Sequence, residues 1–177
     1  MDFFELITTR QSERQYDTRP IESDKIMQCI EAARMAPSAC NAQPWKFIVV
    51  DEPELKKHLA GATSDMGMNK FAFDAPTIIA IVLEKPNLTS KVGSVLKGKD
   101  YTLMDIGIVA AHFCLQATEL GLGTCIIGWF NEKKARKLLQ IPGKKRIPLI
   151  LTVGYATGEI RKKQRKELSE MYSANKY

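Results

Sequence analysis

The segment "YTLMDIGIVAAHFCLQATELG" (residues 101–121) constrains the fold more than any other part of the chain. Its apolar residues recur at helical spacing, and the glycine at its end suits a helix C-cap. One stripe contains Leu103, Ile106, Ala110, Phe113 and Ala117, and another contains Met104, Ile108, Ala111 and Leu115. A helix that is apolar nearly all round is buried nearly all round.

A chain of 177 residues offers two ways to bury such a helix. It lies either at the centre of the core or with its second face against another subunit. Few other elements remain to cover the second face, so we favour a contact with another subunit.

Helical and extended patterns alternate along the chain. We expect helices at 2–10, 22–36, 53–62, 101–120 and 131–140, and strands at 46–50, 75–84, 124–130 and 147–156. The strand at 75–84 is apolar enough to be covered on both faces. No repeat, low-complexity tract or linker divides the chain, so we expect a single domain, residues 1–177. Because helices and strands alternate, we expect one sheet with helices on both faces, in an α/β or α+β fold.

The net charge of +6 is local, because "RKKQRK" (161–166) carries five positive charges and "KKR" (144–146) carries three. A non-enzymatic nucleic-acid-binding domain is therefore one alternative. Such domains interleave aromatic residues with the positive charges, and "RKKQRK" contains none. We therefore expect no nucleic-acid partner.

The cysteine and histidine pattern does not predict a metal site. The four cysteines include no CxxC pair, and the two histidines stand far apart. Reduced, buried thiols are the better interpretation. No stretch approaches the roughly 18 to 20 apolar residues of a membrane span, and the N-terminus lacks a secretory layout. We expect a cytoplasmic protein with no membrane partner.

The segment "RQSER" (10–14) is a candidate anion site. Alternate residues of an extended backbone point to one side, so Arg10, Ser12 and Arg14 can converge on one anion. Two guanidinium groups and a hydroxyl match the oxygens of a phosphate monoester. Arginines at the end of a helix are also favoured by the helix dipole, so a solvated cap is the alternative.

The basic run near the C-terminus bears on the same site. It is by itself typical of a solvated surface. If the tail returns to the first helix, Lys163 and Arg165 lie beside Arg10 and Arg14, and the four make a site for a dianionic phosphate.

The loop "APSACNAQPW" (36–45) is the second candidate site. It carries no charge, and its small residues allow a ligand to approach the backbone closely. Ser38, Asn41 and Gln43 can each donate and accept hydrogen bonds.

Five segments resemble, in sequence and order, those of the nitroreductase family of flavoproteins. They are "RQSERQY" (10–16), "APSACNAQPWKFIVV" (36–50), "FDAPTIIAIV" (73–82), "DIGIVAAHFCLQATELGLGTCIIGWF" (105–130) and "IPLILTVGYATGE" (147–159). The resemblance covers nearly the whole chain. It implies an α+β fold with a central, mostly antiparallel sheet flanked by helices. It also implies an intertwined homodimer with two FMN molecules at the subunit interface.

The resemblance also implies a set of cofactor contacts. Arg10, Ser12 and Arg14 are similar to ligands of the FMN phosphate and ribityl end. Lys163 and Arg165, or the adjacent Arg161 and Lys162, are similar to phosphate contacts of the tail. Along the ribityl chain and flavin ring, the partner subunit's loop would supply Pro37, Ser38, Ala39, Asn41 and Gln43. Near the flavin N5 and pyrimidine edge, the similar residues are Ile126, Ile127, Gly128 and Asn69.

The activity implied is an FMN-dependent oxidoreductase that uses NADH or NADPH to reduce nitroaromatics, quinones or similar small electrophiles by a ping-pong mechanism. It implies no catalytic side chain, since the flavin carries the hydride. Reductive dehalogenation and flavin-fragmenting synthesis are alternatives within the family. They usually come with an insertion between the second strand and the long helix, where this chain has only residues 85–100.

Overall fold

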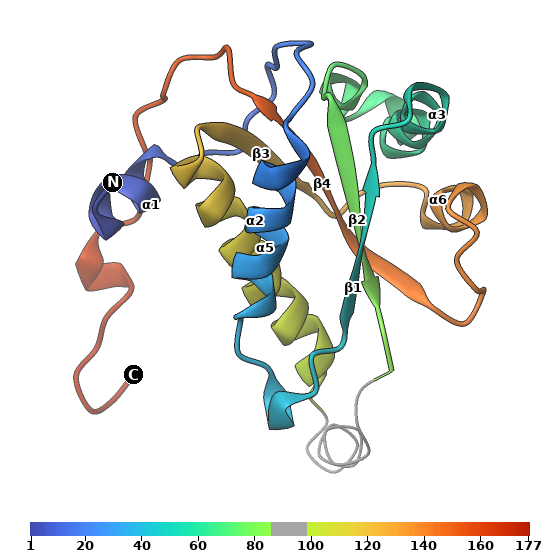
Figure 1. Ribbon diagram of the computed structural model, residues 1–177. Coiled ribbons are helices and arrows are strands. Elements are labelled where there is room, and N and C mark those ends of the chain that lie inside the picture. The colour runs from blue at the N-terminus through green and yellow to red at the C-terminus, as the bar shows by residue number, and fades with distance from the viewer. Residues whose placement is uncertain (86–98) are drawn as a thin grey trace.

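The computed structural model describes residues 1–85 and 99–177. Those residues form an α+β fold of five α-helices and one four-stranded sheet (Figure 1). The helices are α1 (Phe3–Thr9), α2 (Ser23–Arg34), α3 (Pro53–Thr63), α5 (Tyr101–Glu119) and α6 (Glu132–Leu138). The strands are β1 (Trp45–Val50), β2 (Thr77–Leu83), β3 (Leu122–Ile127) and β4 (Arg146–Tyr155). Each helix and strand predicted from the sequence is present.

The sheet is antiparallel throughout, with the strand order β1-β2-β4-β3. Strand β2 lies at its centre and is buried from Thr77 to Val82, as its continuous apolar run predicts. The bounds of β3 differ most from the prediction, because the strand, expected at 124–130, starts at Leu122 and ends at Ile127. The chain leaves the sheet there and turns to Asn131, whose side chain caps α6.

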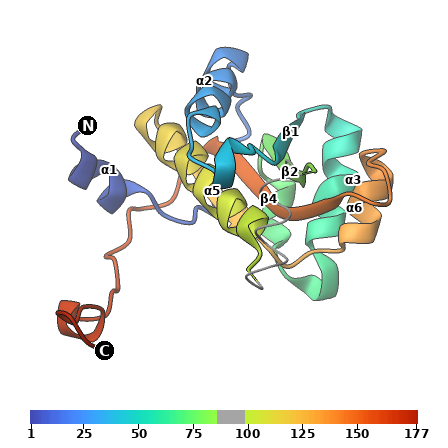
Figure 2. The ribbon, with the colours of Figure 1, turned by 90° about the horizontal axis from the view of Figure 1, so that it is seen from below.

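Helices cover both faces of the sheet (Figures 1 and 2). Helices α2 and α5 pack on one face around Ile106 and Phe113, and α3 and α6 pack on the other around Leu59 and Ile150. Within the described residues, no helix is both long enough and apolar enough to cross a membrane.

The described part of the chain does not enclose helix α5. In its first apolar stripe, Ile106, Ala110, Phe113 and Ala117 are buried, whereas Leu103 is 49% exposed. Met104 and Ile108 of the second stripe are 54% and 37% exposed. Helix α1 lies on the outer side of α5, away from the sheet (Figure 2), and contains no buried residue. Within residues 1–85 and 99–177, nothing fully covers Met104 and Ile108 on the second apolar side of α5.

Candidate functional site

The segment 10–16 follows α1 and lies along the open edge of β3. Ser12 forms a parallel bridge with Thr124, and Tyr16 forms an antiparallel bridge with Ala156 at the end of β4. The Tyr16 hydroxyl is buried and donates to the Glu13 carbonyl over 2.8 Å. These contacts hold the segment extended against the sheet.

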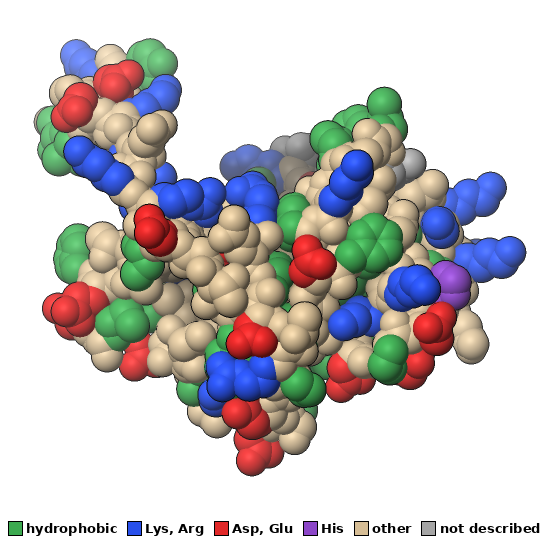
Figure 3. Space-filling model, turned by 90° about the horizontal axis from the view of Figure 1, so that it is seen from above, with side chains coloured by type: hydrophobic (Ala, Val, Ile, Leu, Met, Phe, Trp, Pro, Cys, Tyr) green, Lys and Arg blue, Asp and Glu red, His purple; other side chains and the backbone are tan. Residues whose placement is uncertain are grey.

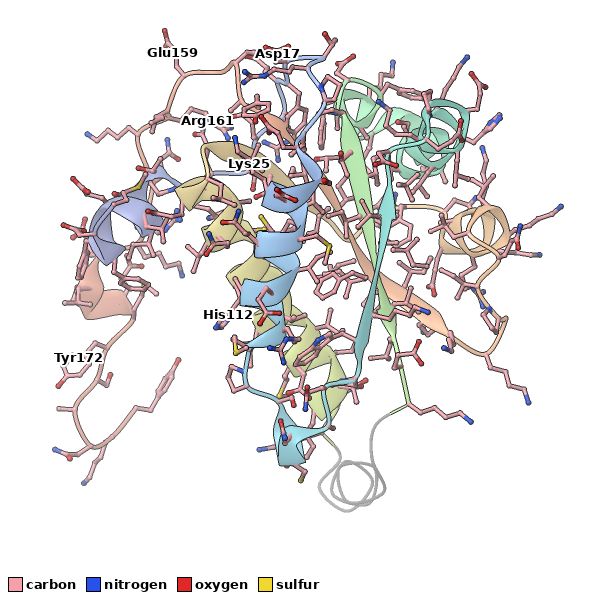
Figure 4. All side chains as sticks on the ribbon, viewed as in Figure 1. Asp17, Lys25, His112, Glu159, Arg161 and Tyr172 are labelled. Carbon is pink, nitrogen blue, oxygen red and sulfur yellow. The ribbon has the colours of Figure 1, made fainter. Side chains whose placement is uncertain are left out.

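The C-terminal segment crosses over this extended segment. The Arg161 guanidinium donates to the Ser12 carbonyl over 2.5 Å, and the Arg161 backbone N–H donates to Gln11 Oε1 over 3.1 Å. The Lys163 ammonium donates to the Arg10 carbonyl. Figure 4 shows Arg161 where the two segments pass each other, whereas Tyr172 lies farther along and away from the body. The structure thus brings together two basic segments that are far apart in the sequence.

A cavity of about 460 Å³ lies between the two segments. Its lining residues are Arg10, Gln11, Ser12, Arg14, Arg161, Lys162, Lys163, Gln164 and Arg165. Six of them are basic and none is acidic. In Figure 3, Lys and Arg side chains gather where the projecting C-terminal segment joins the body. We call this cavity, defined by those residues, the cationic cavity.

The charge of the cationic cavity is not compensated by its own side chains. Burial, followed by the nearby charges of Arg10, Arg165 and Arg161, lowers the pKa of Lys163 below its ordinary value of 10.5. The lowered pKa of Lys163 reflects in part its repulsion by these arginines. A bound anion would relieve this repulsion.

A second cavity of about 580 Å³ adjoins the first and shares Arg10, Lys163 and Arg165 with it. The rest of its lining is Phe4, Ile7, Thr8, Ala111, Cys114, Leu115 and Ile126, which is mostly apolar. Burial raises the pKa of the Cys114 thiol, so Cys114 stays protonated and unreactive at neutral pH. The two cavities together offer a cationic end and an apolar end.

The end of β3 lies close to this pair of cavities. Ile126 lines the apolar cavity, whereas the Ile127 side chain is buried in the core between the sheet and helices α3 and α6. The Asn69 side chain donates to the carbonyls of Thr63 and Trp129 over 3.2 and 3.1 Å. The Asn69 amide therefore connects the end of α3 to Trp129, the residue after Gly128.

The loop 36–45 is held by hydrogen bonds within it and by one to α5, where Asp105 Oδ1 accepts the Ala39 N–H over 3.1 Å. The Gln43 N–H donates to Ser38 Oγ over 3.0 Å, and the Gln43 side chain donates to Asn41 Oδ1 over 3.0 Å. Cys40, Asn41 and Gln43 have φ angles of 53°, 50° and 45°, in the left-handed region that non-glycine residues rarely adopt. Such strain is concentrated at functional sites in proteins.

This loop does not line either cavity of its own chain. Pro37, Ser38, Ala39, Asn41 and Gln43 lie at the C-terminal end of α2, far from the Arg10 segment (Figure 1). Within one chain, the predicted cofactor contacts therefore form two groups at different ends of the fold: the residues that line the cavities and the residues of the loop 36–45.

The sequence did not single out Gln11 and Glu13 as contributors to this region. Alternation places both on the side of an extended segment opposite to Arg10, Ser12 and Arg14, and nothing in the sequence connects them to Arg161 or Gly123. The sequence offers the connection 85–100 as at best a short lid, and residues 86–98 of it lie outside the described part.

In the described ranges, no group of three or more His, Cys, Asp or Glu could hold a metal ion.

Comparisons with known proteins agree on one family. The family model described as "Nitroreductase family" matches residues 7–68 and 62–155. An oxygen-insensitive NADPH nitroreductase of Helicobacter pylori is 24% identical, covering 92% of this chain and 91% of its own length. A nitroreductase family protein of Clostridium novyi is 31% identical, with a TM-score of 0.77 over 93% of this chain and 89% of its own. An FMN-dependent nitroreductase of Clostridium difficile is 28% identical, with a TM-score of 0.80 over 99% and 100%.

Proposed function

The chain belongs to the nitroreductase family, and from that premise we propose that it is an FMN-dependent oxidoreductase that draws electrons from NADH or NADPH. Its acceptors would be nitroaromatics, quinones or similar small electrophiles. The relatives named as FMN-dependent and NADPH-dependent nitroreductases support this choice of cofactor and donor.

The observation that carries the proposal is the cationic cavity beside the apolar one. FMN is a phosphate monoester joined by a polar chain to a flat, largely apolar ring. Six basic side chains in a lining that contains no acidic residue fit the phosphate, and the adjoining apolar surface that includes Ile126 fits a ring. The donor set of the chain therefore fits the cofactor.

Each group of residues has a role in this proposal. Arg10, Arg14 and the basic residues of 161–165 bind the phosphate, and Ser12 adds a hydroxyl donor. When bound, FMN supplies the redox chemistry, since its ring takes a hydride from a nicotinamide and passes electrons to an acceptor. At the end of β3, the Ile126 side chain would border the ring. Ile127, whose side chain is buried in the core, and Gly128 would approach it only through their backbone, beside Asn69.

We also propose that the site is completed by a second copy of the chain. The second copy would cover Leu103, Met104 and Ile108 on α5, which one chain leaves exposed. It would bring its own loop, with Pro37, Ser38, Ala39, Asn41 and Gln43, to the cavities. The separation of the two groups of residues within one chain supports this arrangement.

The visible spectrum of the purified protein tests the proposed function. The protein should carry, or take up from added FMN, the absorption bands of oxidised flavin, and NADH or NADPH should bleach them without oxygen. A colourless protein that takes up no added FMN would contradict the proposal.

Two variants test the phosphate contacts. Arg10→Ala or Arg14→Ala should each weaken FMN binding by about 2 kcal/mol, roughly 30-fold, through loss of a charge-assisted hydrogen bond. The control is Lys133→Ala, which removes the same charge from the exposed surface of α6. If both arginine variants bind FMN as tightly as the control does, these arginines are only helix caps.

A further inference from the structure

Glu13 is a buried carboxylate in the middle of the segment that carries Arg10 and Arg14. Only 4% of its surface is exposed. It brings a negative charge close to the cationic cavity, where the charge opposes the binding of an anion. A residue that weakens the local attraction for anions needs another physical reason to be there.

The carboxylate of Glu13 fixes the backbone of its own segment. Oε1 accepts the backbone N–H groups of Arg14 and Gln15 over 2.8 and 3.0 Å. The Glu13 backbone N–H donates to the Thr124 carbonyl on β3 over 2.8 Å. Arg14 is therefore oriented by its neighbour's side chain as well as by the sheet.

The second carboxylate oxygen acts through Gln11. Glu13 Oε2 accepts the Gln11 side-chain amide over 3.0 Å. Because an ionised carboxylate only accepts hydrogen bonds, Gln11 must turn its NH₂ group toward Glu13. Its carbonyl oxygen then faces Arg161, whose backbone N–H and Nε donate to it, each over 3.1 Å. The same Gln11 amide also donates to the Glu159 carbonyl over 3.0 Å, so the Glu13 carboxylate and that carbonyl together fix the orientation of Gln11 between the two walls of the cationic cavity.

The fold makes space for this side chain at Gly123. A Cβ added to Gly123 would lie 2.7 Å from Glu13 Cγ and 2.9 Å from Glu13 Cβ, closer than packed atoms approach. Glu13 is absent from the lining of the cationic cavity, but it lines an adjoining cavity of about 370 Å³ that shares Gln11, Arg14 and Arg161 with it. The carboxylate therefore lies next to the cationic cavity without lining it.

We propose that Glu13 is a positioning residue for the phosphate site, acting through the Arg14 and Gln15 amides and through Gln11 on Arg161. This inference rests on the proposed function, in which the anion is the phosphate of FMN. Glu13 makes no contact with the ligand. Its contribution is to hold Arg14 and Arg161 so that their charges converge.

The direction of the effect of Glu13→Gln separates positioning from simple charge. If Glu13 only opposed the anion, its neutralisation would tighten FMN binding. If Glu13 positions the two arginines, Glu13→Gln weakens FMN binding, because the amide cannot accept at both of its ends. Riboflavin, which is FMN without its phosphate, is the reference ligand because its binding does not depend on the cationic cavity.

The experiment is a fluorescence titration of the full chain with FMN and with riboflavin, reported as the ratio of the two dissociation constants. Partial unfolding lowers binding of both ligands equally and leaves the ratio unchanged. We expect Glu13→Gln to reduce the wild-type preference for FMN roughly tenfold, the size expected when a charge-assisted contact is lost. Glu13→Ala should do the same. The matched control is Glu159→Gln, which removes a charge from an exposed residue on the nearby C-terminal segment (Figure 4) and should leave the ratio unchanged.

Two results would overturn the proposal in different ways. A wild-type preference for FMN that persists or grows in Glu13→Gln would refute the role of Glu13 alone. A wild-type protein that binds FMN no better than riboflavin would refute the proposed phosphate site, and the role of Glu13 with it.

Discussion

The guanidinium of Arg161 donates a hydrogen bond to the backbone carbonyl of Ser12 over 2.5 Å, which joins the C-terminal segment to the segment after α1. Arg161 also donates to Gln11. Arg161 therefore makes three of the hydrogen bonds between the two segments, beside those from Lys163 to the Arg10 carbonyl and from Gln11 to the Glu159 carbonyl.

Arg161→Ala should release the C-terminal segment. Hydrogen bonds to a charged donor contribute roughly 1.5 to 3 kcal/mol each, so amide exchange in residues 157–166 should become roughly tenfold faster or more. Hydrogen-exchange mass spectrometry measures this change. Lys166→Ala is the matched control, since it removes an exposed positive charge from the same segment. Equal exchange in the two variants would show that Arg161 does not hold the segment.

A pH-dependent contact holds the segment before α2. The Tyr155 hydroxyl donates to Glu22 and accepts from Lys25 Nζ over 2.7 Å, while the Arg19 guanidinium lies 3.5 Å from the centre of the Tyr155 ring. The hydrogen bond from Tyr155 is the main cause that lowers the pKa of Glu22 from 4.5 to about 2. The ionised Glu22 therefore stabilises the folded state.

The sign of this pKa shift gives a prediction for acid unfolding. The folded-state pKa lies below the unfolded-state value, so the contribution of Glu22 is complete above about pH 4.5 and is lost as the pH falls toward 2. Glu22→Gln should flatten the dependence of the urea midpoint on pH in this window. Asp24→Asn, a charge removal in the first turn of the same helix, serves as the comparison. A wild-type slope that persists in Glu22→Gln would contradict the assignment.

The fold could be predicted from the sequence because its signals are local. The continuous apolar run at 75–84 marks the central strand, and Asp2 and Asn131 mark helix starts. The start of β3 could not be predicted, because Leu122 and Gly123 become strand only by pairing with Tyr155 and Gly154 of β4. That pairing joins distant parts of the chain.

The site was predictable only to the extent that its chemistry is local. The spacing of Arg10, Ser12 and Arg14 indicates an anion site without knowledge of the fold. The contributions of Gln11 and Glu13 could not be predicted, since they depend on Arg161, 150 residues beyond Gln11, and on the space at Gly123. Long-range contacts of this kind leave no pattern in a single sequence.

Asp105 on α5 provides a test of how the loop 36–45 is held. Its side chain is 4% exposed, Oδ1 accepts the Ala39 N–H over 3.1 Å, and Oδ2 has no partner among the described residues. Asp105→Ala should lower the free energy of unfolding by about 1 to 3 kcal/mol, because it leaves the Ala39 N–H without its acceptor. Asp105→Asn keeps an acceptor oxygen and should lose less. Urea unfolding of both variants measures the difference, and equal losses would argue against a role for the Ala39 bond.

The exposed side of α5 gives the sharpest test of the proposed second subunit. Met104 and Ile108 are 54% and 37% exposed in one chain, and burying an apolar side chain contributes about 1.5 to 3 kcal/mol. Met104→Lys or Ile108→Lys would place an unpaired charge in the interface, so a dimer should dissociate to monomers in light scattering. FMN binding should weaken in parallel, because the second copy's loop would be lost. Met104→Leu preserves the apolar surface and should remain dimeric, whereas a lysine variant that stays dimeric would show that this side of α5 is not the interface.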